Sequence, residues 1–241
     1  MPITSKHNDL VKKIRKLSER KWRYAYGEYV AEGKRWVDDA KRLCPENVAA
    51  VVCSDDAPCD FADAVIDRTL FDSLSDTKNS QGVLAVMRIP APADRFASDH
   101  CLFLDRVRDP GNMGTVLRTA CAAGYTDIVL HDCVDVFNPK VVRSCMTGIL
   151  GVRFHYDTPP SVLHEKGYTL VAAVLGGEDA FCARLPRQKI CLVIGNEAEG
   201  IRDSIARQCD RRITIPMESS MESLNAAVSA GILMYTLKYA K

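Results

Sequence analysis

The sequence predicts an α/β protein whose second half forms a mostly parallel sheet, with a smaller mixed α/β domain in front of it. In the second half, apolar runs alternate with segments of helical spacing, and we expect strands at 101–107, 127–132, 152–157, 169–175, 190–196 and 212–216. These runs are apolar throughout, which is typical of parallel strands that helices cover on both faces. A polar stretch rich in proline and alanine at about 90–98 indicates a linker. We therefore expect one domain at 1–95 and another at 96–241.

The first domain shows two helical and three strand patterns. Leu10, Val11, Ile14 and Leu17 recur at helical spacing, with lysines and arginines between them. We expect helices at 7–17 and 34–43, and strands at 27–33, 48–54 and 80–89.

Helices are also expected between most strands of the second domain, at 113–124, 138–148, 201–209 and from about 222 onward. Gly124 suits the left-handed residue that ends a helix, and Asn138 with Pro139 suits a helix start. Ligands in sheets of this kind bind at the carboxyl ends of the strands. The loops that follow the strands are therefore the first places to search for a site.

The composition is that of an ordinary soluble globular protein. The 241 residues are 47% apolar and 26% charged, and no apolar run approaches the roughly 20 residues of a membrane helix. The N-terminal stretch lacks the apolar segment of a signal peptide, so we expect a cytoplasmic protein with no membrane contact. The ten cysteines are scattered, no CxxC pair occurs, and no histidine spacing suits zinc. We expect reduced cysteines and no metal.

The formal net charge of +1 hides an uneven distribution. Residues 1–42 hold 12 lysines and arginines against 6 acidic residues, whereas residues 43–99 hold 4 against 10. A basic N-terminal segment suits a polyanion such as RNA. A solvated helix face is the commoner meaning of such a run, and charge alone does not separate the two.

The first unusual loop follows the first expected strand of the second domain. Asn112 is expected to cap the helix after the turn formed by Asp109, Pro110 and Gly111. Arg118 lies off the apolar stripe of that helix. It is either a solvated arginine or a side chain aimed at a phosphate or a reacting hydroxyl.

The second loop spans 193–201 and fits neither common glycine-rich motif. Gly195 and Gly200 have P-loop spacing, but Ile201 and Arg202 replace the phosphate-binding lysine and its serine or threonine. No GxGxxG occurs, which argues against a dinucleotide site. Two glutamates in this loop are only two positions apart and form a poor acid–base pair, so a simple polar turn remains an alternative.

The third loop opens the C-terminal helix. Ser219 and Glu222 have the spacing of a capping box, and the helix is expected to bury a stripe formed by Leu224, Ala227, Val228, Gly231, Ile232 and Tyr235. Small residues in its first turns allow close approach by another element. No GxSxG motif surrounds the serines, which argues against a serine hydrolase.

Together and in this order, the three loops resemble the motifs of the SpoU (TrmH-like) class of the SPOUT superfamily, the RNA 2′-O-ribose methyltransferases. The resemblance rests on DPGNMGTVLRTA (109–120), IGNEAEG (194–200) and IPM…SLNAAVSAG (215–231), and it covers 101–241. In the first domain, VAEGKRWVDDA and SQGVLAV are similar to an accessory RNA-binding domain related to ribosomal protein L30e.

The resemblance implies several properties that composition and spacing do not. The second domain would have a trefoil-knotted fold, form a homodimer with an active site completed across the interface, and bind S-adenosylmethionine without a metal. Residue by residue, the family motifs imply cofactor contacts by Gly195, Ile215 and Leu224, with Asn196 and Gly200 close by.

The same motifs imply catalytic roles for Asn112, Arg118, Glu197, Ser223 and Asn225, all of which are present. The family mechanism assigns removal of the ribose hydroxyl proton to the arginine that matches Arg118. Because the pKa of arginine exceeds 12, charge stabilisation of the alkoxide or a grip on the adjacent phosphate are alternatives.

The expected activity is therefore methylation of a ribose 2′-hydroxyl in structured RNA. Ribosomal RNA is the first choice of substrate and transfer RNA the second. A non-catalytic RNA-binding factor with the same fold is the main alternative, and cofactor binding discriminates between them. A base methyltransferase fits the asparagine–arginine first motif less well.

Overall fold

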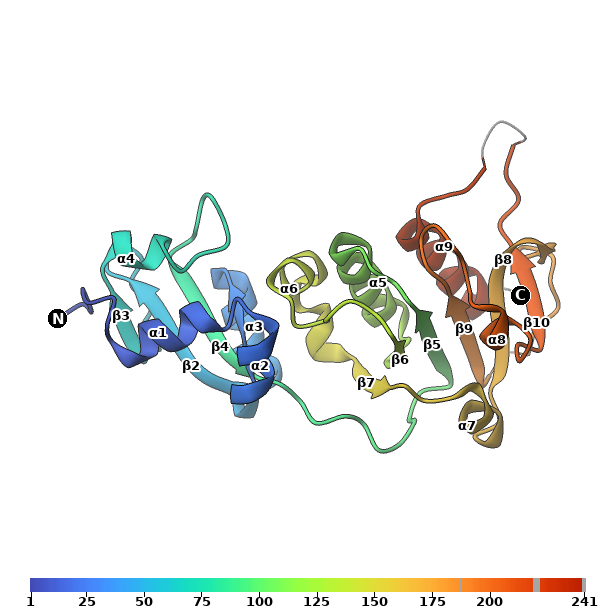
Figure 1. Cartoon of the computed structure of the whole chain (residues 1–241), viewed down its shortest axis with the longest axis horizontal. Coiled ribbons are helices and arrows are strands. Elements are labelled where there is room, and N and C mark those ends of the chain that lie inside the picture. The colour runs from blue at the N-terminus through green and yellow to red at the C-terminus, as the bar shows by residue number, and fades with distance from the viewer. Residues whose placement is uncertain (187, 219–221, 240–241) are drawn as a thin grey trace. The chain divides into compact units, whose positions relative to one another are not determined.

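The computed structural model describes residues 1–186, 188–218 and 222–239. Its contacts divide the chain into two compact units, Met1–Ala91 with Phe137–Leu150 and Pro92–Val136 with Gly151–Lys241 (Figure 1). The expected linker at 90–98 contains no helix or strand. The sequence alone places 137–150 in the second domain, whereas its contacts lie with the first unit. The domain boundary between residues 95 and 96 stays a prediction.

The first unit is built on a four-stranded sheet of order β1–β4–β2–β3. Its strands are β1 (Glu28–Glu32), β2 (Val48–Ser54), β3 (Ala64–Ile66) and β4 (Val83–Arg88). Its helices are α1 (Asp9–Lys16), α2 (Arg20–Tyr26), α3 (Lys34–Leu43), α4 (Arg68–Asp72) and α6 (Pro139–Cys145), with the 3-10 segments η1 (Pro45–Asn47) and η2 (Met146–Gly151). The sequence patterns missed α2, β3 and α4, because segments of three to seven residues are too short to show a clear period.

Helices cover both faces of this sheet. Helix α1 and helix α4 share a buried cluster with the strands, formed by Val11, Ile14, Leu17, Val52, Ile66, Phe71, Leu84 and Val86. On the other face, the ring of Tyr29 packs 6.4 Å from Trp36 and 5.0 Å from Phe137, measured between centroids. The indole of Trp36 donates a hydrogen bond of 2.9 Å to the carbonyl of Met146. These contacts account for the inclusion of 137–150 in the first unit.

The second unit contains a six-stranded sheet of order β10–β8–β9–β5–β6–β7, in which every pairing is parallel. Its strands are β5 (His100–Asp105), β6 (Asp127–His131), β7 (Arg153–Tyr156), β8 (Thr169–Asp179), β9 (Ile190–Ile194) and β10 (Arg211–Thr214). Its helices are α5 (Pro110–Ala123), α7 (Pro160–Glu165), α8 (Asp203–Ala206) and α9 (Ala226–Tyr239). All six expected strands are present, so the predicted fold class is confirmed. The trefoil knot stays a prediction.

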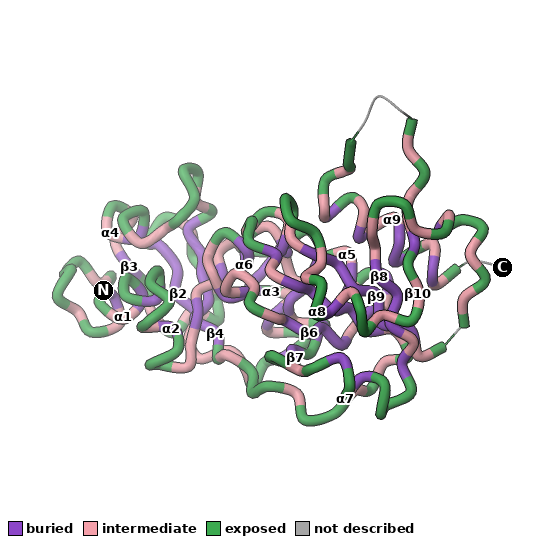
Figure 2. The backbone as a smooth tube through the Cα atoms, turned by 45° about the vertical axis from the view of Figure 1, so that its right-hand side comes forward, coloured by how far each residue is buried: buried purple, intermediate pink, exposed green. Residues whose placement is uncertain are grey.

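The core of the second unit lies on both faces of the sheet, and Figure 2 shows the buried positions gathered in the strands. Helices α7 and α8 cover one face, where the buried cluster comprises Cys101, Phe103, Val129, Leu163, Tyr168, Leu170, Cys191, Val193 and Ile205. Helices α5 and α9 pack against each other, and α9 also contacts β9. The first and third motifs, which open α5 and α9, therefore belong to helices that pack together although they lie far apart in the sequence.

Helix α5 begins earlier than expected, and its cap is a different residue. Asp109 is the N-cap, Pro110 occupies the first turn, and the Asp109 carboxylate accepts the amide of Asn112 at 2.7 Å. Because proline lacks an N–H and suits the first helical position, the cap lies just before it. The expectation that Asn112 caps this helix is therefore wrong, and its side chain is free for another role. Gly124 ends α5 in the left-handed conformation, as predicted.

Helix α9 begins later than expected and buries a different stripe. Its first residue is Ala226, and the side chain of Asn225 accepts the amides of Ala227 and Val228 at 2.9 and 3.2 Å. The proposed capping residue Ser219 lies outside the described residues. Val228 and Tyr235 were expected to be buried but are 49% and 44% exposed. The buried residues are Ala227, Ala230, Leu233, Met234 and Leu237.

A buried carboxylate anchors the end of the linker to the second unit. Asp127, the first residue of β6, is fully buried and accepts the amides of Ala97 and Ser98 at 2.9 and 2.6 Å. Arg153 reaches its two oxygens at 2.9 Å, and Nε2 of His155 lies 3.0 Å from it. Burial raises the pKa of Asp127, but these partners outweigh burial and hold it well below the usual value.

Candidate functional site

A cavity of about 550 Å³ lies at the carboxyl ends of β8, β9 and β10. The second motif loop and the start of α9 form much of its wall. All five residues predicted to contact a cofactor line it: Gly195, Asn196, Gly200, Ile215 and Leu224. Of the predicted catalytic residues, Glu197 and Ser223 also line it. Tertiary folding thus brings the second and third motifs around one space of the size that small-molecule sites have.

Gly195 lets the second loop fold tightly onto itself. A Cβ atom at this position would lie 2.2 Å from the carbonyl carbon of Gly200 and 2.3 Å from the amide nitrogen of Ile201, too close for any side chain. Asn196 and Gly200 exchange two backbone hydrogen bonds of 3.0 Å each. Gly200 has a φ of +68°, which favours glycine. The two glycines therefore shape a narrow backbone hairpin that forms one side of the cavity.

Glu197 ties the second loop to the first. One carboxylate oxygen accepts the side-chain amide of Asn112 at 3.1 Å and the backbone amide of Asp109 at 3.2 Å, and the other accepts the amide of Arg108 at 3.3 Å. Partial burial raises the pKa of Glu197, but the hydrogen bonds outweigh this effect, so the pKa lies below the usual glutamate value. Glu197 is therefore an anionic acceptor at neutral pH and is poorly suited to act as a general acid.

Asn112 extends this connection to the third loop. Its side-chain oxygen accepts a hydrogen bond of 2.9 Å from the side-chain amide of Asn225, whose own oxygen caps α9. The chain Glu197–Asn112–Asn225 therefore runs through all three motif loops. A change at any of these residues would disturb the relative positions of the loops.

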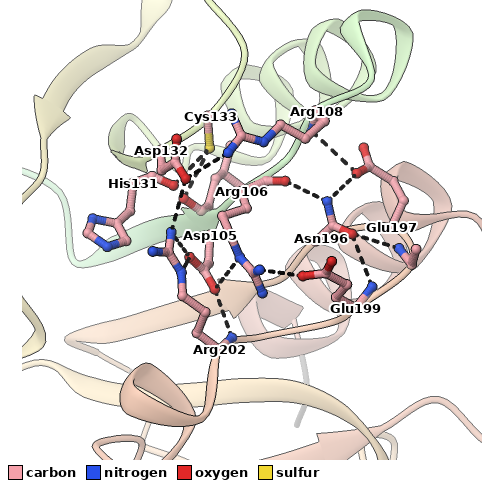
Figure 3. Close-up of polar contacts among 12 residues, drawn as sticks. Asp105, Arg106, Arg108, His131, Asp132, Cys133, Asn196, Glu197, Glu199 and Arg202 are labelled. Atoms are coloured by element: carbon pink, nitrogen blue, oxygen red, sulfur yellow. Dashed lines mark hydrogen bonds and ion pairs between the residues drawn. The ribbon is translucent and has the colours of Figure 1, made fainter.

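A second polar network connects the end of β5 to the second motif loop (Figure 3). Asp105, the buried last residue of β5, accepts both the backbone amide and the Nε of Arg202 at 2.8 Å. Arg106 pairs with Glu199, and its carbonyl accepts the side-chain amide of Asn196 at 2.9 Å. The network thus holds both ends of the second loop against the end of β5.

Asp105, Arg106 and Arg202 were not predicted as site residues. One signal for Asp105 was present in the sequence, because this charged residue directly follows four apolar residues of an expected strand. Arg106 also has a φ of +57°, a conformation that is uncommon for a residue with a side chain, and such strained positions cluster at functional sites. That second signal exists only in the folded structure.

Arg118 does not join the cluster of Asn112, Glu197 and Asn225. It is exposed on α5, and six residues separate it from Asn112, or about 9 Å along the helix axis. Among the described residues it forms no hydrogen bond or ion pair. Its lack of an internal partner leaves the guanidinium available to a ligand, and its catalytic role stays a prediction.

The described residues contain no group of three histidine, cysteine or acidic side chains that could hold a metal ion.

All ten cysteines are free thiols. Burial raises the pKa of Cys133 to about 11 and that of Cys209 to about 12, so these thiols are protonated at neutral pH. A second cavity of about 530 Å³ lies in the first unit, away from the motif loops. No described helix has the length and apolar character needed to cross a membrane.

Comparison with known families and proteins matches both halves of the chain. The SpoU rRNA Methylase family matches residues 99–235, and the MRM3-like substrate binding domain matches residues 8–85. The chain is 30% identical to the 23S rRNA (guanosine(2553)-2′-O)-methyltransferase RlmP of Bacillus subtilis, with 98% of each chain covered. It is 33% identical to the 23S rRNA (guanosine-2′-O-)-methyltransferase RlmB of Xylella fastidiosa, with 56% of each covered.

Solved structures give the same result at the level of the fold. The AdoMet-bound rRNA methyltransferase of Sinorhizobium meliloti superposes with a TM-score of 0.84 at 26% identity, covering 99% of this chain and 97% of that one. The similarity therefore extends over both units as well as the motif loops.

Proposed function

Because this chain belongs to the SpoU rRNA Methylase family, we propose that it transfers a methyl group from S-adenosylmethionine to a ribose 2′-hydroxyl in structured ribosomal RNA. One observation carries the proposal: Glu197, Asn112 and Asn225 connect three motif loops beside a cavity that fits a small molecule. The curated relatives act on guanosine in 23S rRNA, as their names state. Transfer RNA is the second choice of substrate.

The lining of the cavity fits the cofactor chemically. Ile215, Leu224 and other aliphatic side chains provide an apolar surface for a nucleobase, and Gly195 and Gly200 line the cavity without side chains that would fill it. Three carboxylates also line the cavity, at Glu197, Glu199 and Glu222, and suit a positively charged sulfur centre. When bound, S-adenosylmethionine supplies a methyl group activated by that sulfur. We assign its binding to Gly195, Asn196, Gly200, Ile215 and Leu224.

The catalytic work of the protein is positioning and charge stabilisation. The loops are held in place by Asn112, Glu197 and Asn225, so that the ribose and the cofactor are correctly oriented toward each other. Ser223 is available to bind a polar group at the edge of the cavity. Arg118 stabilises the hydroxyl oxygen as its proton passes to solvent water, or grips the adjacent phosphate. Either role keeps the guanidinium charged.

We also propose that the protein acts as a homodimer through α9. Val228, Tyr235 and Tyr239 are 49%, 44% and 63% exposed, and their spacing places them on one side of the helix. Such an exposed apolar stripe is typical of an interface. A partner subunit could then bring its own Arg118 to a site that this subunit's Arg118 does not join. Sedimentation of Tyr235→Glu, compared with the unaltered protein, tests this assembly.

The first domain, 1–95, is proposed to bind the RNA. Its match to a substrate-binding domain and the excess of basic residues in 1–42 both support this role. We further propose that the enzyme needs no metal and works in the cytoplasm.

Calorimetry of the full chain with S-adenosylmethionine, with and without a chelator, tests the cofactor assignment. Mapping of ribose methylation in RNA from cells with and without the protein then tests the substrate. A folded protein that binds no cofactor would leave only the non-catalytic RNA-binding alternative, and chelator sensitivity would refute a metal-free site.

A further inference from the structure

The first two helices present an aromatic pair surrounded by lysines. The rings of Trp22 and Tyr26 stack with centroids 5.8 Å apart. The ammonium groups of Lys16 and Lys21 lie 4.5 and 5.0 Å from the Trp22 ring centroid, and that of Lys13 lies 6.0 Å from the Tyr26 ring centroid. We call these five residues the α1–α2 aromatic face.

This face remains accessible although its rings are apolar. Tyr26 is 41% exposed, Lys16 and Lys21 are exposed, and Trp22 is half-buried. The hydrophobic side of α1 is already occupied, because Val11 and Ile14 are buried in the core of the unit. The stacked pair is therefore not needed to close that core.

Another basic residue holds the two helices together, which leaves Lys16 and Lys21 free for a ligand. Arg23 is buried, and its guanidinium donates hydrogen bonds of 2.9 and 2.8 Å to the carbonyls of Leu17 and Ser18 at the end of α1. Lys13 forms an ion pair with Glu28 at 2.6 Å. The ammonium groups of Lys16 and Lys21 form no hydrogen bond or ion pair among the described residues and interact only with the ring of Trp22. Such a cation–π interaction is weak at an exposed site.

We propose that the α1–α2 aromatic face binds an unpaired segment of the RNA substrate, with one base stacked on the Trp22–Tyr26 pair and with Lys16 and Lys21 on the phosphates of that segment. The proposal rests on the proposed function and specifies where and how its RNA is held. A single strand exposes the faces of its bases, and aromatic rings beside basic side chains are how proteins bind such strands. A duplex keeps its bases stacked inside and offers phosphates alone.

The charge distribution favours the same orientation. Residues 1–42 carry twice as many basic as acidic residues, whereas residues 43–99 carry 10 acidic against 4 basic residues. A polyanion is therefore attracted to the part of the first unit that holds the aromatic face and is repelled by the rest.

Tryptophan fluorescence of the full chain provides a direct test. The protein has two tryptophans, and Trp36 is only 4% exposed, so a base that stacks on Trp22 should quench mainly the accessible indole. We expect quenching by a single-stranded oligoadenylate of about eight nucleotides, little quenching by a blunt RNA duplex of equal length, and loss of the response in Trp22→Phe. Equal quenching by the duplex would overturn the stacking proposal.

The lysines are tested by the salt dependence of oligoadenylate binding. The double variant Lys16→Gln/Lys21→Gln should weaken binding about tenfold and reduce the slope of log K against log salt by about 1.4, since each contact with a single strand contributes about 0.7. Lys41, 5.6 Å from the ring of the exposed Phe61, offers a matched lysine–aromatic pair elsewhere in the unit. Lys41→Gln should leave binding unchanged, and equal weakening would refute the assignment.

These readouts separate the two proposals. Oligoadenylate binding requires no methyl transfer, so it would persist if the proposed enzymatic activity failed. Conversely, an active enzyme whose RNA binding did not depend on Trp22, Lys16 or Lys21 would keep the proposed function and remove the proposed face.

Discussion

At each end of the six-stranded sheet a carboxylate connects segments that are distant in sequence, but the two carboxylates have different roles. At the amino ends of the strands, Asp127 is buried and joins the linker to β7 through Arg153 and His155. At the carboxyl ends, Glu197 is exposed at a cavity and joins two loops through Asn112 and backbone amides. Each carboxylate accepts several hydrogen bonds from segments that are distant in sequence.

The difference lies in the partners and in their burial. Asp127 is out of contact with water and is paired with Arg153, whose side chain is partly exposed, so loss of its partners would leave a buried, unpaired carboxylate. Glu197 accepts hydrogen bonds from neutral donors at the rim of a cavity, where water can replace a lost partner. We infer that the first carboxylate stabilises the fold, whereas the second sets loop positions for chemistry.

The largest expected effect is on stability. Asp127→Ala would leave His155 and two backbone amides without their acceptor, while the partly exposed Arg153 can bind water instead. We expect a loss of about 3 kcal/mol in the free energy of unfolding. Denaturant unfolding measures this change. The matched control is Glu178→Ala, which removes the exposed ion pair with Arg211 and should change stability by less than about 1 kcal/mol. If the two variants lost similar amounts of stability, Asp127 would not have the stabilising role assigned to it.

The next effect is on the rate of methyl transfer. Because Arg118 is exposed and off the apolar side of α5, Arg118→Ala should change stability by less than about 1 kcal/mol. Transfer at saturating cofactor should nevertheless fall about a hundredfold or more, as on loss of one charge-stabilising donor.

The control for Arg118 is Arg207→Ala, another exposed arginine of the second unit, which should retain full activity. Arg118→Lys keeps the charge but loses the planar fork, so substantial activity would favour simple charge stabilisation. An Arg118→Ala protein with a normal rate would remove this residue from the mechanism.

A smaller effect is expected when the acceptor of the loops is altered. Glu197→Gln keeps the shape of the side chain but gives it an NH₂ group that cannot accept the amides of Arg108 or Asp109. We expect methyl transfer to fall about tenfold, consistent with loss of one charge-assisted hydrogen bond, with little change in unfolding. Glu199→Gln alters the pairing with Arg106 and one carboxylate of the cavity but leaves the hydrogen bonds of Glu197 in place, so it should have a weaker effect. The reverse order would contradict the role given to Glu197.

The smallest effect concerns acid pH. The pKa of Asp127 is held below its usual value in the folded protein, so the unfolded chain binds more protons below about pH 4. Its stabilising contribution is therefore present above that pH and declines as the pH falls toward the folded-state pKa. Unfolding curves at several acid pH values should show a shallower decline in Asp127→Asn than in the unaltered protein. Equal slopes would show that other carboxylates dominate acid unfolding.

The fold class and the place of the candidate site could be predicted from the sequence. Six apolar runs separated by helical patterns identify a covered parallel sheet, because burial on both faces leaves no polar alternation to obscure the strands. The positions of the three motif loops followed from their places after strands. Gly195 and Gly200 were singled out by their spacing and by the family resemblance, whereas the tight hairpin that requires them is visible only in the structure.

Which residues contact one another could not be predicted from the sequence and depends on the tertiary structure. Asn112 was expected to cap α5, but Pro110 places the cap at Asp109 and leaves the Asn112 amide to bridge Glu197 and Asn225. Val228 and Tyr235 fit a buried helical stripe equally well by spacing, yet they are exposed. Periodicity indicates that a helix has an apolar side, but which side is covered depends on contacts with segments far away in the chain.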